Sequence, residues 1–312
     1  MPNTLAHLGT EAALIRLGWR RADLKWIYLG CVIPDLPWIL QRAVRLLPGQ
    51  VDPYGLLLYS SVQASLLFGL VLSGALAACA VRFRRAFGLL SLAVLLHLLL
   101  DACQTKWANG VHLFAPFSWR LTNFALFWPE HGLSYALTLF GLVYVAAYLR
   151  QSCRAPLGLT HRRWPLALGL LAAYLLLPLI CGEGARRADN YYVRTLQETT
   201  ARTGRPIAFD RARYFAAPET PAVRSFAGER LAVTGLKLDG PAIVSLRGRF
   251  LSRDRIAVEA FHVHRSGLRD LSSYLGLGLV GLVWLGAVVA GRAKERGELG
   301  NRVARQDIGH KP

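Results

Sequence analysis

The 312-residue chain is rich in apolar side chains and poor in charged ones: 53% of its residues are hydrophobic and 18% are charged. Its 37 basic and 19 acidic side chains give a formal net charge of +18, and the charges lie between long apolar runs. This composition excludes a disordered chain and a cytosolic enzyme, and it is typical of a protein that crosses a membrane several times. Five cysteines without a Cys-x-x-Cys pair exclude a disulfide scaffold and a zinc ribbon.

The N-terminal part predicts a short helix followed by an interrupted one. Asn3 or Thr4 is a candidate N-cap for a short helix that carries His7. The apolar segment Leu24–Leu40 contains Asp35 between two prolines, which interrupt a regular helix. The sequence therefore predicts a broken or re-entrant helix there, with a full span as the alternative. Charges at positions 11, 16 and 20 leave no apolar core for a secretory signal peptide.

Five further segments are long and apolar enough to cross a bilayer, which takes about 20 residues. They are residues 54–81, 86–103, 132–149, 164–181 and 272–291. We therefore predict a mostly α-helical, polytopic membrane bundle of five or six spans. Residues 1–181 form its main part, 272–291 its last helix and 292–312 a basic cytoplasmic tail.

The arginines in the short loops predict the orientation of the bundle. Loops 82–85 and 150–163 contain arginine and no acidic residue, and Arg292, Lys294 and Arg296 follow the last span, so all three belong on the cytoplasmic side. The loop 104–131 and the segment 182–271 then face outward. The N-terminus lies inside if Leu24–Leu40 crosses and outside if it does not.

Residues 182–271 differ from the rest because they contain 26 charged positions, 16 basic and 10 acidic. We predict an amphipathic helix over 188–204, then strands within 229–238, 242–250 and 255–264. These give a small extracytoplasmic α+β domain, either an OB-like barrel or a sandwich. A net charge of +6 and few aromatics argue against nucleic acid and favour lipid headgroups, with a protein partner as an option. His262 and His264 share one strand face, but we expect a solvated strand end there, because two exposed imidazoles lack further ligands.

The most informative feature is a pair of ionisable residues inside an apolar span. His97 and Asp101 are four residues apart, so they share one helix face. Ionisable residues in spans cost a few kcal/mol and usually mark a functional site, although a structural hydrogen-bonded pair is an alternative. With His7, Asp35 and His112 they form a mixed histidine and aspartate set, the nitrogen and oxygen ligands that suit zinc or manganese.

The motif order AHLG at 6–9, GCVIPDLPW at 30–38 and HLLLDACQTKWANGVHLFAPFSW at 97–119 resembles bacterial membrane-bound metal-dependent hydrolases, also described as LexA-binding inner-membrane-associated hydrolases. The resemblance covers about residues 1–150, and it implies a multi-pass protein of the bacterial inner membrane. It implies that His7, Asp35, His97 and Asp101 are metal ligands and that Pro116, Phe117 and Ser118 are a structural signature. The motifs are also loosely similar to those of zinc-dependent phospholipase C enzymes, which implies a phosphodiester or phospholipid substrate.

One departure from that family concerns its histidine-rich middle motif. The corresponding stretch at 53–69 contains Tyr59, Ser60, Ser61, Gln63 and Ser65 but no histidine. A smaller ligand set makes a multinuclear centre doubtful and favours a mononuclear or degenerate one.

Together these features predict a hydrolase that uses a divalent ion on an extracytoplasmic or lipid-linked ester. His97 and Asp101 would be adjacent ligands, Asp35 a bridging or second ligand, and His7 a further imidazole. We expect His112 or His131 to act as a general acid or to orient a ligand. The alternatives are a non-catalytic scaffold with a degenerate metal site, and a proton-relay transporter, for which no inverted repeat is evident.

Overall fold

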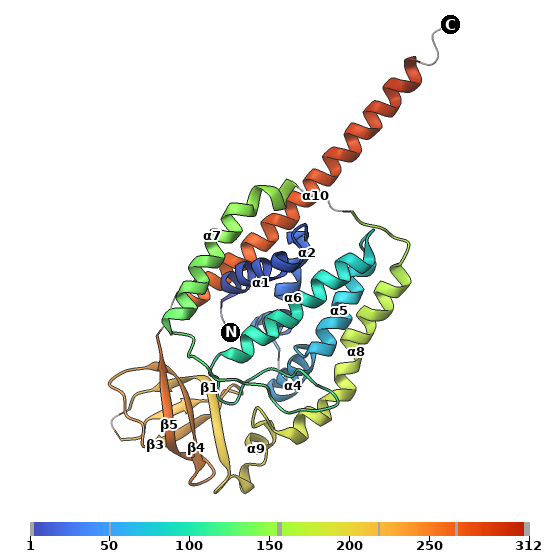
Figure 1. The fold of residues 1–312 in the computed structure, drawn as a ribbon. Coiled ribbons are helices and arrows are strands. Elements are labelled where there is room, and N and C mark those ends of the chain that lie inside the picture. Colours follow the sequence, from blue (N-terminus) through green and yellow to red (C-terminus); the bar gives the residue numbers. More distant parts are fainter. Residues whose placement is uncertain (1–2, 50, 155–157, 218, 266–267, 309–312) are drawn as a thin grey trace.

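The computed structural model describes residues 3–49, 51–154, 158–217, 219–265 and 268–308. It places a small β-barrel at one end of a helix bundle (Figure 1). The helices are α1 (Thr4–Gly18), α2 (Leu24–Val32), α3 (Leu36–Leu46), α4 (Pro53–Gln63), α5 (Leu66–Ala78), α6 (Phe83–Cys103), α7 (Gly132–Arg154), α8 (Trp164–Ala188), α9 (Val193–Gln197) and α10 (Leu268–Ile308), with 3-10 turns η1 (Ile33–Asp35) and η2 (Thr199–Ala201). The strands are β1 (Pro206–Phe215), β2 (Ala222–Arg224), β3 (Arg230–Thr234), β4 (Ala242–Phe250) and β5 (Arg255–His264).

Four helices in the described part of the chain are long and apolar enough to cross a membrane: α6, α7, α8 and the segment Arg269–Gly291 of α10. The helices α4 and α5 form a fifth candidate, bent by 69° at their junction. The continuous helix expected over 54–81 is therefore wrong. The backbone amide of Leu66 at the bend donates to the carbonyl oxygen of His112, so the loop after α6 satisfies a group that the helix leaves open.

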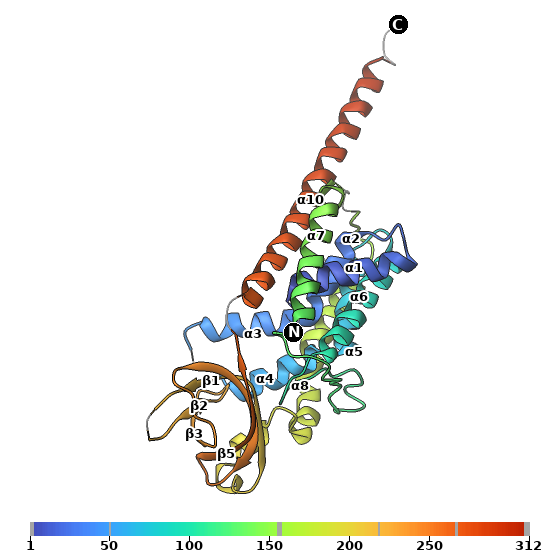
Figure 2. The ribbon, with the colours of Figure 1, turned by 60° about the vertical axis from the view of Figure 1, so that its left-hand side comes forward.

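The interrupted helix predicted at Leu24–Leu40 is confirmed. α2 ends before Pro34, η1 makes one tight turn, and α3 continues at an angle beside the barrel (Figure 2). At the opposite end, the guanidinium of Arg85 donates to the backbone oxygen of Arg21 and lies 5.4 Å from the ring centroid of Trp19. The turn between α1 and α2 therefore lies with the arginine-containing loops, at the end of the bundle away from the barrel.

The helix α1 lies inside the bundle, where it packs against α6, α7 and α10. It passes so close to α7 that a Cβ atom added at Gly141 would overlap the carbonyl oxygen of Leu5, and one added at Gly9 would overlap the Cα of Gly141. α2 approaches α6 in the same way, because a Cβ at Gly30 would clash with Ala93. These glycines allow close backbone contact and bring the N-terminal segment to α6.

Residues 206–264 form a closed barrel in the order β1-β2-β3-β5-β4, in which β3 and β5 pair in parallel and the other neighbouring strands pair antiparallel. The three predicted strands correspond to β3, β4 and β5, and a closed five-stranded barrel agrees with the OB-like expectation. β1 and β2 were not predicted. The barrel has an apolar core of its own, separate from that of the bundle.

The helix expected over 188–204 is wrong, because α8 continues to Ala188 and the chain then turns sharply. Asp189 and Tyr192 both adopt positive φ angles, 50° and 56°. The carboxylate of Asp189 accepts hydrogen bonds from the backbone amides of Arg194 and Thr195, so it caps the short helix α9. The tail predicted from residue 292 continues α10 as helix to Ile308, and residues 309–312 lie outside the described residues.

Candidate metal centre and cavity

Two helices each contribute a pair of polar residues spaced four apart to the buried centre. α6 presents His97 and Asp101 on one face, and α1 presents His7 and Glu11. The side chains of His7, His97 and Glu11 are fully buried. The two imidazole rings stack with their centroids 3.8 Å apart. The structure thus brings the first and third motifs of the sequence into direct contact.

The donor atoms of these residues converge. Ligand atoms of His7, His97 and Asp101 all lie within 4.8 Å of one another. The Nε2 atom of His7 is 3.5 Å from Oδ1 of Asp101, and Nε2 of His97 is 3.6 Å from Oδ1 of Asp35. Asp35 reaches the centre because η1 holds it at the break between α2 and α3. All four predicted ligands therefore lie together.

These four atoms share a further property that bears on metal binding. Within the described part of the structure, His7 Nε2, Asp35 Oδ1, His97 Nε2 and Asp101 Oδ1 are buried without a hydrogen-bond partner. Leaving a buried polar atom unpaired costs about 1–3 kcal/mol, so four such atoms facing one another are costly unless a ligand satisfies them. Two imidazole nitrogens and the carboxylate oxygen of Asp101 converge closely enough to hold a zinc ion, and Asp35, beside His97, is a candidate fourth ligand. Manganese also accepts such ligands.

Three residues around the centre were not identified from the sequence. Glu11 Oε1 lies 2.7 Å from Nδ1 of His7, and its Oε2 accepts a hydrogen bond from the thiol of Cys31 at 2.7 Å. Lys106 Nζ lies 3.3 Å from Oδ2 of Asp101. A carboxylate on Nδ1 fixes the tautomer that leaves Nε2 of His7 free to bind a metal. The signal in the sequence was the four-residue spacing of Glu11 from His7, the same as in the His97 and Asp101 pair.

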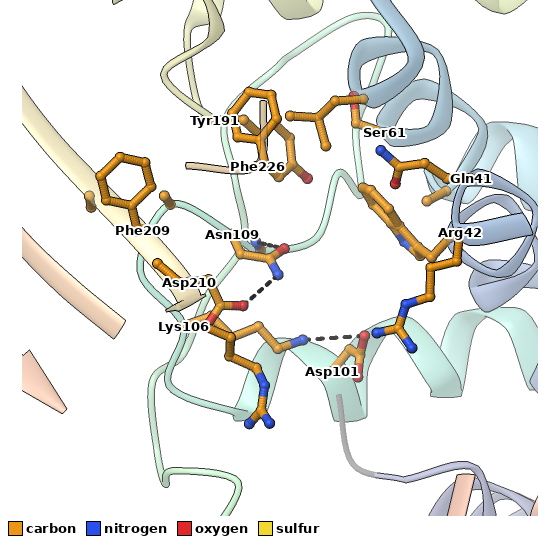
Figure 3. A pocket seen from close by; sticks show the side chains of 18 of the residues that line it. Gln41, Arg42, Ser61, Asp101, Lys106, Asn109, Tyr191, Phe209, Asp210 and Phe226 are labelled. Carbon is orange, nitrogen blue, oxygen red and sulfur yellow. Dashed lines mark hydrogen bonds and ion pairs between the residues drawn. The ribbon is translucent and has the colours of Figure 1, made fainter. Parts of the chain in front are cut away.

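The centre borders a cavity of about 710 Å³ between the end of the bundle and the barrel. Figure 3 shows Asp101 and Lys106 on one side of it, joined by their ion pair, with Arg42 nearby. Asn109 Nδ2 donates to Oδ2 of Asp210 at 2.9 Å across the cavity wall, linking the loop after α6 to the barrel. Asp101 thus belongs to both the buried centre and the cavity.

A β-bulge shapes the barrel side of the cavity. The pairing of β1 with β4 shifts register between Phe209 and Ala212, and Arg211 takes a φ of 57°. A bulge turns consecutive side chains away from the regular alternation of a strand. Asp210 and Arg211 both line the cavity as a result. The same irregularity hides β1 in the sequence, because it breaks the period-two pattern.

The two histidines expected to assist catalysis lie in different places. His112 lines the cavity, packs edge-on against Trp119 with the centroids 5.6 Å apart, and is 3% exposed. Burial lowers its pKa to about 4, so its imidazole is neutral near pH 7. His131 is exposed at the start of α7, where its Nδ1 accepts a hydrogen bond from the backbone amide of Leu133. The structure therefore brings His112 to the cavity and leaves His131 at the surface.

Residues 53–69, where the resemblance would place a histidine-rich motif, border the cavity. Ser61 lines it, and the hydroxyl of Ser61 donates to the carbonyl of Leu58. Gln63 instead points toward α8, since its amide donates to the carbonyl of Tyr174. Of the predicted signature, the side chain of Phe117 is 91% exposed. The backbone amide of Ser118 donates to the carbonyl of Phe114, which closes a turn in the loop after α6.

Comparison of the chain with protein-family models, with curated proteins and with solved structures finds no match in any of the three. The family resemblance therefore stays a prediction that depends on the short motifs.

Proposed function

We propose that the protein is a membrane-embedded, metal-dependent hydrolase that acts on a phosphoester of an amphiphilic, lipid-linked substrate. The observation that supports this most strongly is the group of four buried, unpartnered donor atoms on His7, Asp35, His97 and Asp101 beside a cavity. These four residues would hold the ion. When bound, a divalent ion lowers the pKa of a water ligand to about 7 and polarises a phosphoryl oxygen.

The charge of the cavity supports an anionic substrate. Among its described lining residues, seven are lysine or arginine and three are aspartate. The basic residues come from α3, the loop after α6, β1, β2 and α10, so they surround the opening from several sides. Arginine and lysine side chains recognise phosphate groups through charge-assisted hydrogen bonds. A phosphoester fits this lining better than a neutral ester.

The position of α3 supports a lipid-linked substrate. The helix lies crosswise at the end of the bundle (Figure 2), and it exposes Leu40 and Leu46 while Arg42 and Arg45 line the cavity. A short helix with apolar residues on one side and arginines on another is typical of the membrane–water interface. Apolar rings, among them Trp38 and Phe226, line the same cavity. A headgroup phosphate could therefore enter while its acyl chains stay in the bilayer.

Side chains of the protein itself would then orient the reacting groups. Lys106 holds Asp101 in place and presents its ammonium to the cavity, where it can neutralise a phosphoryl oxygen. Neutral His112, on the wall, can accept a proton from an attacking water. Glu11 keeps the His7 imidazole in one tautomer.

A non-catalytic scaffold is the second candidate function. Three observations favour the scaffold. Glu11 pairs directly with His7, Lys106 pairs directly with Asp101, and residues 53–69 contain no histidine. In that case the buried residues form a structural polar network, and the barrel binds a partner. The two candidates differ in whether a metal ion is retained.

The deciding experiment is metal content by elemental mass spectrometry on detergent-purified full-length protein. The comparison is between the wild type, a His97→Ala, Asp101→Ala double variant, and a His161→Ala control at an exposed histidine outside the cluster. We expect the wild type and the control to retain zinc or manganese at this centre and the double variant to lose it. The double variant should also fail to hydrolyse phospholipid in vesicles, which the wild type and the control should hydrolyse.

Retention of the full wild-type amount of metal by a folded double variant would overturn the proposal. The absence of metal from the wild type after purification in metal-supplemented buffer would overturn it as well, and would favour the scaffold. His7→Gln provides a second, milder variant, because it keeps a polar side chain of similar size.

A further inference from the structure

A second group of metal-ligand side chains lies outside this centre, where the loop before α7 meets the barrel. Glu130 Oε1 is 2.8 Å from Nδ1 of His264, and Glu130 Oε2 is 3.2 Å from Nε2 of His262. Ligand atoms of the three residues all lie within 4.8 Å of one another. The solvated strand end expected here is therefore wrong, because Glu130 supplies a third ligand that is distant in sequence and His264 is buried.

Contacts outside the group orient both imidazoles. The His262 ring stacks on Trp128 with centroids 3.9 Å apart and an interplanar angle of 4°. Nε2 of His264 lies 2.8 Å from Oγ of Ser245, and that hydroxyl lies 3.0 Å from Oδ1 of Asp210. Metal-binding histidines usually bond through their second nitrogen in this way, which fixes the ring and leaves the first nitrogen for the ion.

The same contacts also resemble a serine nucleophile with its base and acid, in the order Ser245, His264 and Glu130. Burial argues against that role, because Ser245 is 0% exposed and a substrate cannot reach its hydroxyl. The hydroxyl is further engaged, since it accepts a hydrogen bond from the amide of Arg211. The side chains of Glu130 and His262, by contrast, are 13% and 27% exposed, so a small ion can reach them from solvent.

We propose that Glu130, His262 and His264 bind a divalent ion of the zinc class, which joins the barrel to the loop before α7. Two histidines and one glutamate are a known ligand set for zinc, with water as the fourth ligand. Binding requires the ligand atoms, now in direct contact, to separate to about 3.3 Å around the ion, which is a small movement of side chains. The guanidinium of Arg211, 3.5 Å from Glu130 Oε1, opposes the ion, whereas the nearby carboxylate of Asp210 favours it.

This ion would also fix one wall of the cavity. His264 is linked through Ser245 to Asp210, and Asp210 is held on its other oxygen by Asn109. The cluster thus connects the strand just before α10 and the loop just before α7 to the bulge of β1. Loss of the ion should loosen the barrel against the bundle while leaving the buried centre of α1 and α6 intact.

The test is titration with Co²⁺ and Zn²⁺ of the full-length protein in detergent after stripping with a chelator. Tetrahedral Co²⁺ reports the geometry by its visible absorption, and equilibrium dialysis reports the number of ions bound. The variants are His262→Ala and Glu130→Gln, with His161→Ala as the matched exposed control. His97→Ala is measured alongside to separate the two sites.

We expect His262→Ala and Glu130→Gln each to bind one equivalent of metal fewer than the wild type. Zn²⁺ should raise the thermal midpoint of the wild type but not that of these two variants. His161→Ala should lose neither, and His97→Ala should keep the equivalent that depends on His262. Unchanged stoichiometry and thermal shift in folded His262→Ala would overturn the inference. Because the two sites respond to different variants, either proposal can fail while the other stands.

Discussion

The orientation of a few donor atoms decides what the buried centre can do. An imidazole that donates from Nδ1 to a carboxylate presents the lone pair of Nε2, and Glu11 Oε1, 2.7 Å from Nδ1 of His7, is placed to accept that proton. The two carboxylate oxygens of Asp101 also have different neighbours: Oδ2 lies near Lys106 and Oδ1 lies near His7. His7 and Asp101 therefore each have one atom held by the protein and another that faces the centre.

Replacement of Lys106 by methionine tests whether an ion shares the charge of Asp101. Without metal, the variant takes the ammonium partner away from a buried carboxylate, which should cost about 3–5 kcal/mol. With metal, the ion neutralises the carboxylate and the loss should be smaller. Thermal unfolding of stripped and metal-loaded protein measures both, and Lys237→Met, at an exposed barrel lysine, serves as the control. An equal loss in both forms would show that no ion contacts Asp101.

The depressed pKa of His112 predicts a specific dependence of stability on pH. Its pKa is about 4 in the folded protein, against 6.5 for an ordinary histidine, because burial disfavours the imidazolium. The unfolded chain binds more protons between these values, so this stabilising contribution is complete above pH 6.5 and is lost as the pH falls toward 4. His112→Gln should reduce the loss across this interval by about 3 kcal/mol. Parallel thermal melts of wild type and variant would show it, and identical curves would contradict it.

At the scale of elements, the sequence predicts local features and misses long-range ones. The prolines beside Asp35 predict the broken helix, and the spacing of His97 and Asp101 predicts their shared face, because both depend on near neighbours. The sequence does not predict the bend between α4 and α5, because the backbone amide of Leu66 at the bend is satisfied by the carbonyl of His112, which is distant in sequence. The place of α1 was missed as well, because it depends on contact between Gly9 and Gly141.

Gly141→Ala tests the contact that holds α1 in place. The added methyl group would overlap the backbone of Leu5, which cannot move aside as a flexible side chain can. Overpacking costs about 1–3 kcal/mol, and the displacement of α1 should also withdraw His7 from the centre. We expect a lower thermal midpoint and weaker metal binding. Gly169→Ala in α8, where an added Cβ meets no other atom within 4 Å, should change neither; similar effects of the two substitutions would contradict this role for Gly141.

At the scale of the whole molecule, the cavity exists because two independently packed cores meet. The bundle supplies Asp101 and Lys106, and the barrel supplies the bulge with Asp210 and Arg211. The sequence predicts both parts, from the long apolar runs and from the alternating strands. It does not predict their docking, because Asn109 and Asp210 that join them are ordinary polar residues within their own segments.

The arginine-containing loops at one end of the molecule and the barrel at the other predict its orientation in the membrane. This prediction can be tested directly. Arg84 lies at the end opposite the barrel and Arg253 in the turn between β4 and β5, and both side chains are exposed. Since arginines in short loops stay in the cytoplasm, we expect a membrane-impermeant maleimide to label Arg253→Cys in intact spheroplasts. Arg84→Cys should react after permeabilisation, and the unsubstituted chain corrects for its own cysteines. The reverse pattern would place the barrel and the cavity mouth in the cytoplasm, where the substrate would have to be a lipid of the inner leaflet.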